Sequence, residues 1–328
     1  MLWLIYALGG GWGHLTRAAA LARAASQRHA VRILTNSPYA TQVHGLDIVI
    51  VESREAAVAQ IEAAKPAALI VDTFPRGIGG ELATVLPSLN AAKILIHRDL
   101  NPRYVAAASL RDFVASNYDL VLIPGAGEGS DFPGQVTSPW LVRSSDELST
   151  ANAHGQPIVC ASGIAEELEW YGEVAARLPD ALCIAPVCPP GCPPERWTRH
   201  WPAIDLFPGA SVVVGGAGYN TVHEALACRV PLVTRSWPRM YDRQSRRAAR
   251  AAQHAEVTIV TTPTEAVTAA QHHRSAGPCP VSFPNGASHA VSLIESCIPA
   301  SPEPRASATG TYIPGPTKSP NPTSNSTA

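Results

Sequence analysis

Short hydrophobic runs alternate with alanine-rich or amphipathic stretches along most of the chain. A short apolar run bounded by turn residues is typical of a buried parallel strand, and parallel strands need crossover connections such as helices. In the first half the pattern predicts strands at 2–8, 31–35, 47–51, 69–71, 94–96 and 120–123. A second series begins with a strand at 157 that runs into a glycine loop at 163, and continues at 181–185, 211–214, 231–234 and 256–261.

This alternation predicts the α/β class, with two Rossmann-like domains, each a doubly wound parallel sheet, facing one another across a cleft. The length of 328 residues suits two such domains. The expected bounds are 1–140 for the first domain, 141–156 for a linker, 157–298 for the second domain and 299–328 for a tail. The tail is rich in Pro, Ser and Thr without apolar periodicity, so we expect it to be disordered and to take no part in chemistry.

The most informative segment comes after the three valines Val212–Val214, where glycines lead into a helix. The start of a helix presents unpaired N–H groups and the positive end of the helix dipole, which suits a phosphate. Asn220 and Thr221 are expected at this helix start, and the carboxylate of Glu224 on the same helix suits two vicinal hydroxyls. A nucleoside diphosphate needs both features. The alternative interpretation is an ordinary turn of an α/β domain.

The next thirty residues narrow the choice, because a strand at Pro231–Thr234 precedes Trp237-Pro238 and then Asp242 and Gln244 at the start of a helix expected at 245–252. The order GG-x-G-x-N-T-x-x-E-A, V-P, D-x-Q resembles the donor signature of GT-B glycosyltransferases. These include the lipid-linked N-acetylglucosaminyltransferases of bacterial wall synthesis and the UDP-glycosyltransferases. One departure is Arg229, where these families usually have glycine.

The resemblance implies GT-B architecture and a hexosyl- or N-acetylhexosaminyl-transferase that uses a nucleotide-diphospho-sugar, expected to be UDP-linked. Carried over by position, the diphosphate, ribose and sugar would be bound by Gly163, Gly216, Gly218, Asn220, Thr221, Glu224, Asp242 and Gln244. The partners are then this donor and an acceptor that the sequence does not identify.

The amino-terminal strand ends in a second glycine loop, Gly9 to His14, before an alanine-rich helix expected at 15–25. Imidazole titrates near neutrality, so His14 can take a proton from an attacking hydroxyl. The alternative is that His14 only caps the helix or binds a phosphate. The form G-x-G-H-x-x-R is similar to the acceptor-side loop of GT-B enzymes, which implies Gly13 and Arg17 there and His14 as the catalytic base or as a ligand of the acceptor. It also resembles the loop of a GT-B hydrolase, in which the histidine activates water.

Two further strand ends carry polar residues, Asp72 after one and Arg98-Asp99 after another. The carboxyl edge of a parallel sheet faces the ligand, so all three are expected on the acceptor side. D-x-F-P-x-G with a later R-D is similar to a group of bacterial predicted glycosyltransferases. The structural alternative is that Arg98 and Asp99 pair with each other. For the whole protein, hydrolysis and a non-catalytic sugar-nucleotide-binding module remain the alternative functions.

Composition excludes some partners. The formal net charge of -1 gives no electrostatic case for nucleic acid. The sequence also lacks the D-x-D carboxylate pair that other glycosyltransferases use to hold a divalent ion, so we expect neither a metal nor a cofactor. Arg243, Arg246, Arg247 and Arg250 share one helix face, which predicts a solvated surface or a peripheral membrane contact through anionic head groups. Cysteines in apolar runs suit a reducing cytoplasmic setting, and the oligomeric state stays open.

Overall fold

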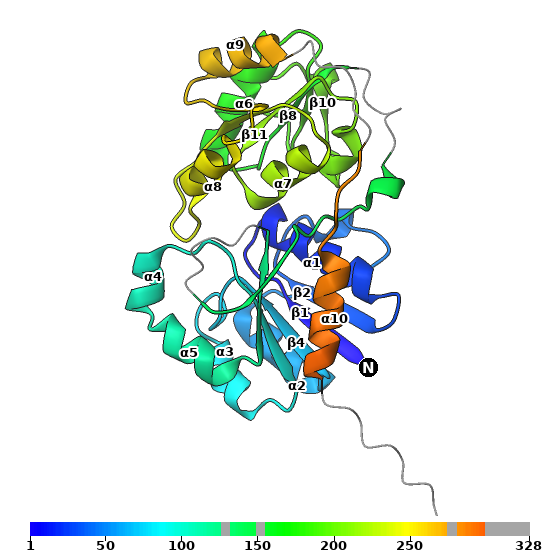
Figure 1. Cartoon of the computed structure of the whole chain (residues 1–328), viewed down its shortest axis with the longest axis vertical. Helices are drawn as coiled ribbons and strands as arrows, with labels where there is room; N and C mark the ends of the chain where they lie inside the picture. Colours follow the sequence, from blue (N-terminus) through cyan, green and yellow to red (C-terminus); the bar gives the residue numbers. More distant parts are fainter. Residues whose placement is uncertain (126–131, 149–154, 274–280, 299–328) are drawn as a thin grey trace, which may run out of the picture. The chain divides into compact units, whose positions relative to one another are not determined.

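The computed structural model describes residues 1–125, 132–148, 155–273 and 281–298. Within these ranges the chain forms two parallel sheets (Figure 1), one of seven strands and one of six. The expected tail at 299–328 and the central part of the expected linker, 149–154, lie outside the described residues. The extents expected for the two domains stay predictions.

The first sheet has the strand order β3-β2-β1-β4-β5-β6-β7, and every neighbouring pair is parallel. Its central strands are predominantly apolar and almost entirely buried, as expected for strands covered on both faces. Its strands are β1 Leu2–Tyr6, β2 Ala30–Thr35, β3 Asp47–Ile50, β4 Ala68–Asp72, β5 Ala92–Ile96, β6 Leu120–Pro124 and β7 Gln135–Thr137. The helices between them are α1 Trp12–Ala25, α2 Arg54–Ala64, α3 Leu82–Val85, α4 Pro102–Ala107 and α5 Leu110–Asn117.

The second sheet has the order β10-β9-β8-β11-β12-β13, again with parallel neighbours. Its strands are β8 Pro157–Cys160, β9 Leu182–Ile184, β10 Trp197–Thr198, β11 Val212–Gly216, β12 Leu232–Arg235 and β13 Val257–Ile259. The helices of this half are α6 Ala165–Arg177, α7 Tyr219–Ala227, α8 Gln244–Ala251 and α9 Pro263–His273. Short 3-10 helices occur at Ala40–Gln42, Leu86–Ser88, Ser145–Glu147, Pro194–Arg196 and Ala203–Leu206.

The last helix, α10 Ala287–Cys297, comes after the second sheet in sequence but packs against α1 and strands β5, β6 and β7 of the first. Figure 1 shows it in orange beside the blue α1. Alanines make up much of the buried face of α1, and small side chains let two helices approach closely. The carboxylate of Glu295 on α10 also receives His29 at 2.6 Å and Arg28 at 3.0 Å. The first domain is therefore completed by the far end of the chain.

Two local expectations are wrong. Helix α1 begins at Trp12 rather than 15, so His14 lies in its first turn and not in a loop. The strands expected for the first domain also end at 123, whereas the sheet has a further strand, β7, at Gln135–Thr137. Two of the three residues of β7 are exposed, so it lacks the apolar run that marks a buried strand. None of the helices in the described ranges is both long and apolar enough to span a bilayer.

Candidate active site

The direction of the strand order reverses at β1 in the first sheet and at β8 in the second. Strand β1 lies between β2 and β4, and strand β8 lies between β9 and β11, so later strands were added on both sides of each. Loops that leave such a point diverge to opposite faces of the sheet and leave a crevice at the carboxyl edge. Helix α1 follows β1, Asp72 ends β4, and α7 follows β11. The candidate residues therefore lie at the two positions where doubly wound sheets bind ligands.

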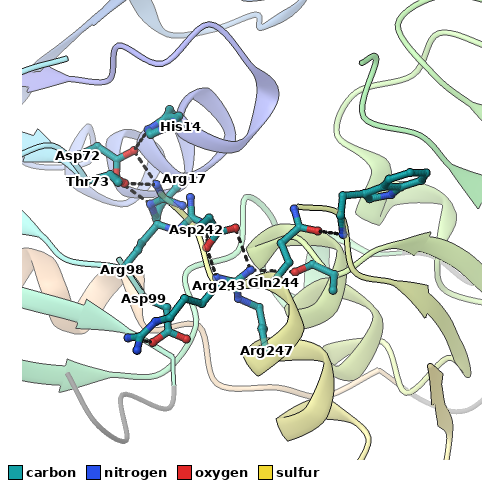
Figure 2. Close-up of polar contacts among 12 residues, drawn as sticks. His14, Arg17, Asp72, Thr73, Arg98, Asp99, Asp242, Arg243, Gln244 and Arg247 are labelled. Carbon is teal, nitrogen blue, oxygen red and sulfur yellow. Dashed lines mark hydrogen bonds and ion pairs between the residues drawn. The ribbon is translucent and has the colours of Figure 1, made fainter. Parts of the chain in front are cut away.

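His14 is held from behind by a buried ion pair (Figure 2). Its Nδ1 lies 2.6 Å from Asp72 Oδ2, and Arg17 donates to both oxygens of the same carboxylate, at 2.8 and 2.6 Å. The side chains of Asp72 and Arg17 are completely buried, whereas 14% of the His14 side chain is exposed. Because an ionised carboxylate can only accept, Nδ1 carries the ring proton and Nε2 is left as an acceptor.

The surrounding charges set the protonation of this group. Burial by itself would raise the pKa of Asp72, but Arg17 and His14 outweigh burial and hold that pKa at about 2. Burial lowers the pKa of His14 below its ordinary value; the Asp72 carboxylate opposes the shift, and Arg17 and Arg98 add to it. At neutral pH the site therefore holds a neutral imidazole against an ionised carboxylate, which is the state of a general base.

The backbone around His14 is tightly constrained. A side chain on Gly9 would have its Cβ 2.3 Å from Cδ2 of His14, so only glycine leaves room for the ring. Thr73, whose hydroxyl accepts from Arg17 at 3.1 Å, has a φ of 71°. This left-handed conformation is rare for a branched residue and costs about 1–3 kcal/mol. Strain of this kind clusters at ligand sites, where the surrounding structure enforces it.

The second glycine loop starts α7 without any capping side chain. Gly218 is the N-cap residue, it makes no side-chain cap bond, and the first turn of α7 contains no acidic residue. Asn220 and Thr221 lie in that turn, two and three positions after the N-cap. The N–H groups of this turn therefore have neither a cap nor a local negative charge, which favours binding of an anion.

Glu224 lies in the next turn of α7 and is only 4% exposed. Burial raises its pKa to about 8, and the negative charge of Asp205 adds to the shift. A buried carboxylate is costly unless hydrogen-bond donors surround it. Hydroxyl groups of a ligand would supply such donors.

The interpretation of Arg98 and Asp99 as a mutual pair is wrong. The guanidinium of Arg98 lies 3.1 Å from Asp242 in the second half of the chain. The Asp99 carboxylate instead forms ion pairs with three arginines. Arg243, just before α8, lies 2.8 Å away, and Arg246 and Arg250 of α8 lie 3.6 and 4.0 Å away. Burial makes the pKa of Arg98 fall to about 10, although Asp242 opposes the shift. The partners of these two side chains could not be predicted from sequence spacing, because they lie in the other domain.

The expectation of a fully solvated arginine face on α8 is wrong for the same reason. Arg247 is 6% exposed and donates to Asp242 at 2.7 and 3.2 Å and to the carbonyl of Ala217 at 2.8 Å. Arg98 and Arg247 together hold the pKa of Asp242 far below its usual range despite burial. The backbone continues this junction, since Leu100 and Asp242 form an antiparallel bridge. A contact of the arginines with anionic head groups stays a prediction.

These elements surround one cavity of about 480 Å³, which we call the front cavity. Most predicted site residues line it, from both halves of the chain: Gly13, His14, Arg98, Asp99, Gly216, Gly218, Asn220, Thr221, Glu224, Asp242 and Gln244. Asp72 and Arg17 lie behind His14 and not on the cavity surface. Gly163, with a φ of 99°, is flanked by the lining residues Ser162 and Ile164. The side-chain oxygen of Gln244 is engaged by the backbone N–H of Trp237 at 3.0 Å.

The comparisons with known proteins agree on the fold. No protein-family model matches the sequence, and no curated protein does. A glycosyltransferase of kitacinnamycin shares 16% identity, with 91% of this chain and 99% of that chain covered, at a TM-score of 0.57. The spinosyn rhamnosyltransferase SpnG, solved with thymidine diphosphate, shares 15% identity, with 91% of this chain and 96% of that chain covered, at a TM-score of 0.58. MurG of Acinetobacter baumannii shares 15% identity, with 90% of this chain and 100% of that chain covered, at a TM-score of 0.56.

The chain has the GT-B fold. This confirms the predicted class of two α/β domains with parallel sheets, and the structural neighbours are glycosyltransferases.

Aromatic side chains of the GT-B cavity were not foreseen from the sequence. Trp12 lines the cavity and is stacked between Tyr39 and Trp201, with ring centroids 4.8 and 5.9 Å away. The indole N–H of Trp201 donates to Thr16 of α1 at 3.1 Å and so joins the two halves. Phe74 stacks on the His14 ring at 5.6 Å. The sequence held one signal for this aromatic cluster, the large apolar side chain of Trp12 inside a glycine loop.

Among the residues that the structure describes, no group of three or more His, Cys, Asp or Glu side chains is arranged to hold a metal ion. The positive groups around the front cavity are instead arginines and the start of α7.

Proposed function

We propose that this chain transfers a sugar from a nucleotide-diphospho-sugar to the hydroxyl group of an acceptor, without a metal ion. One observation carries the proposal. A single cavity is lined on one side by a neutral histidine, His14, held in place by a buried carboxylate, and on the other by the uncapped start of α7. The first suits removal of a proton from a nucleophile, and the second suits stabilisation of a departing diphosphate.

The donor would lie against the second sheet. The N–H groups at the start of α7 and the side chains of Asn220 and Thr221 would bind the diphosphate. The buried Glu224 would accept from the two vicinal ribose hydroxyls, which favours a ribonucleotide such as UDP over a deoxyribonucleotide. SpnG binds thymidine diphosphate, so thymidine nucleotides are the natural comparison. Gln244, whose orientation is fixed by the N–H of Trp237, would face the hexosyl or N-acetylhexosaminyl group.

The acceptor would lie against the first sheet, beside His14 and the aromatic rings of Trp12 and Phe74. Nε2 of His14 takes the proton of the acceptor hydroxyl while its oxygen attacks the anomeric carbon. The bond from that carbon to the diphosphate breaks, and the electron pair leaves with the diphosphate. Asp72 keeps Nδ1 protonated and stabilises the imidazolium that forms, while Arg17 keeps Asp72 ionised.

The test is a panel of UDP- and thymidine-diphospho-sugars, screened first by thermal shift and then for nucleotide release with and without a mixture of hydroxylated acceptors. We expect UDP-sugars to raise the melting temperature and nucleotide release to need an acceptor, with a glycosylated product detected by mass spectrometry. Release at the same rate without an acceptor would show a hydrolase, and stabilisation without any turnover would show a binding module.

A matched pair of variants ties the result to the site. Glu224→Gln removes a carboxylate of the front cavity, whereas Glu173→Gln removes an exposed one on α6 that pairs with Arg177 at 2.9 Å. Only the first should weaken stabilisation by the donor. Equal stabilisation of both variants would remove Glu224 from the donor site.

A further inference from the structure

A second cavity, of about 570 Å³, lies on the other face of α7, and we call it the back cavity. Asn220, Thr221 and Glu224 of α7 line the front cavity, whereas Val222, His223 and Leu226 line the back one. Residues with these spacings occupy different faces of a helix. A volume of this size lies within the range of pockets that hold small molecules, roughly 300–1,000 Å³. The proposed sugar transfer makes no use of it.

Most of the wall of the back cavity is apolar, and it is made by several elements: Ile123, Pro124, Pro139, Leu141, Val222, Leu226, Ala227, Ala251, Phe283 and Pro284. Such a wall suits an aliphatic or aromatic body. Polar side chains interrupt it, and one of them is buried without a hydrogen-bond partner among the described residues. His97, at the end of β5, is 2% exposed, and within the described part of the chain neither of its ring nitrogens has a hydrogen-bond partner. A buried imidazole without partners is costly, so a polar group of a ligand would stabilise it.

The charges around the back cavity are mainly positive. Four arginines line it, Arg98, Arg229, Arg247 and Arg250. Arg98 and Arg247 pair with Asp242 and Arg250 lies 4.0 Å from Asp99, so of these four the charge of Arg229 is the one that no carboxylate among the described residues balances. The buried imidazoles report the same potential: burial and then nearby arginine charges lower the pKa of both His97 and His223 to about 3. Both rings therefore stay neutral, and the positive charge is that of the arginines alone. The potential favours an anionic ligand.

Arg229 is in an unusual backbone conformation for an arginine. Helix α7 ends in a Schellman motif, in which Arg229 N–H donates to the carbonyl of Leu226 at 3.2 Å and Val230 N–H to that of Ala225 at 3.1 Å. Arg229 is the left-handed residue of the motif, with a φ of 51°, a position that glycine occupies without strain. Its exposed side chain makes no ion pair among the described residues. Left-handed residues other than glycine cluster at ligand sites, and Arg229 lines the back cavity.

From these observations we propose that the back cavity is a second binding site, for an amphiphilic anion with an apolar body and a terminal phosphate or carboxylate. The apolar body would pack against Val222, Leu226 and Phe283. Arg229 would pair with the anionic group, and a polar atom of the ligand would bond to His97. The site is distinct from that of the proposed transfer, because its occupant would lie on the other face of α7 from Glu224, although Arg98, Asp99 and Tyr219 line both cavities.

The test is calorimetric titration of the full chain with octyl phosphate, with octan-1-ol as the uncharged control. We expect one octyl phosphate per chain and much weaker binding of octanol. Arg229→Gly should lower the affinity for octyl phosphate by roughly tenfold to a hundredfold, which is the effect of losing a charge-assisted hydrogen bond. The same variant should melt at an equal or higher temperature, because glycine relieves the left-handed conformation, so its loss of affinity cannot be ascribed to unfolding.

Further variants and one competitor complete the test. Arg229→Lys keeps the charge and should retain most of the affinity, and Arg103→Ala removes an exposed arginine of α4 and should have no effect. Leu226→Trp should fill the cavity and abolish binding. Absence of binding, or equal affinity in Arg229→Gly and wild type, would overturn the proposal. Displacement of octyl phosphate by UDP would place it in the front cavity and also overturn the proposal.

A final arm separates two sources of the same ligand chemistry. Vesicles of phosphatidylglycerol are compared with vesicles of phosphatidylcholine by co-sedimentation. Binding to the anionic vesicles that is lost in Arg229→Gly identifies a lipid head group. Binding of octyl phosphate without sedimentation identifies a soluble amphiphile.

Discussion

The two glycine loops of this protein share their backbone plan and differ in their charges. Each comes after a central strand of a parallel sheet and leads into a helix whose N-cap glycine, Gly11 or Gly218, makes no side-chain cap. Behind the first loop lies a carboxylate, Asp72, that is already neutralised by Arg17 and bonded to His14. Behind the second lies Glu224, buried and with a raised pKa.

The difference separates two kinds of preorganisation on the same βα unit. At the first loop the protein supplies every partner itself, so the charges are fixed before any ligand arrives. At the second loop the polar groups are buried ahead of their partners, so a ligand has to complete them. The first arrangement suits proton transfer and the second suits binding, and substitutions at the two loops should therefore have different effects.

The largest effect is expected at the first loop. His14→Asn keeps a hydrogen-bonding side chain but cannot take a proton, so kcat should fall by roughly 10²–10⁴-fold. Affinity for UDP should not change, because the nucleotide is held by the second loop. A base acts when deprotonated and the pKa of His14 is lowered, so kcat of the wild type should fall only on the acid side of the ordinary histidine pKa, and the variant should lack this limb. Nearly full kcat in His14→Asn would make the residue a ligand.

A large stability effect is expected beside it. Asp72→Asn leaves the buried Arg17 without its counter-charge, so the free energy of unfolding measured in urea should drop by about 3–5 kcal/mol. Glu224→Gln at the second loop removes a carboxyl group that has no such partner, and it should cost far less. Equal losses in the two variants would break the comparison between the loops.

Ligand affinity should show the reverse pattern. Glu224→Ala should lower the affinity for UDP by roughly tenfold to a hundredfold, or about 1.5–3 kcal/mol, because the hydrogen bonds to the ribose are lost. Titration with 2′-deoxy-UDP isolates one of these bonds. The wild type should prefer UDP to the deoxy form, and the variant should bind both alike. A preference that survives in the variant would assign the ribose to another residue.

The pH dependence of stability should sharpen the contrast further. The pKa of Glu224 is raised to about 8 in the folded chain, above that of the unfolded chain, so the folded state holds its proton longer. Stability of the empty protein should therefore fall as pH rises from about 4.5 to 8, by up to about 1.4 kcal/mol per pH unit. Glu224→Gln should lack this contribution, which urea unfolding at several pH values would reveal. Parallel curves for the two proteins would contradict the raised pKa.

No effect is expected from chelation. The start of α7 and neutral donors are proposed to stabilise the diphosphate, so turnover should continue unchanged in excess EDTA. Loss of turnover that magnesium or manganese restores would mean that the second loop does not act alone.

Strand positions could be predicted from the sequence because each buried strand is an apolar run bounded by turn residues. The glycine loops and most lining residues followed from those strands. The three-residue β7 and the two-residue β10 could not, since neither is long or apolar enough to stand out. The partners of Arg98 and Asp99 were also out of reach, because the arginine and aspartate that bind them lie in the other domain. Arg229 was visible as a departure from glycine, but its cavity was not.

The return of α10 to the first sheet bears on how this protein is made on the ribosome. Helix α10 covers α1 and contacts β5, β6 and β7, so that surface stays uncovered until α10, which follows the whole second sheet in sequence, has been synthesised. The strands and helices of the second sheet are synthesised before α10, and they pack mainly against one another. We therefore expect the later-encoded half to mature first and the earlier-encoded half to wait for it, against the usual amino-to-carboxyl order of domain folding.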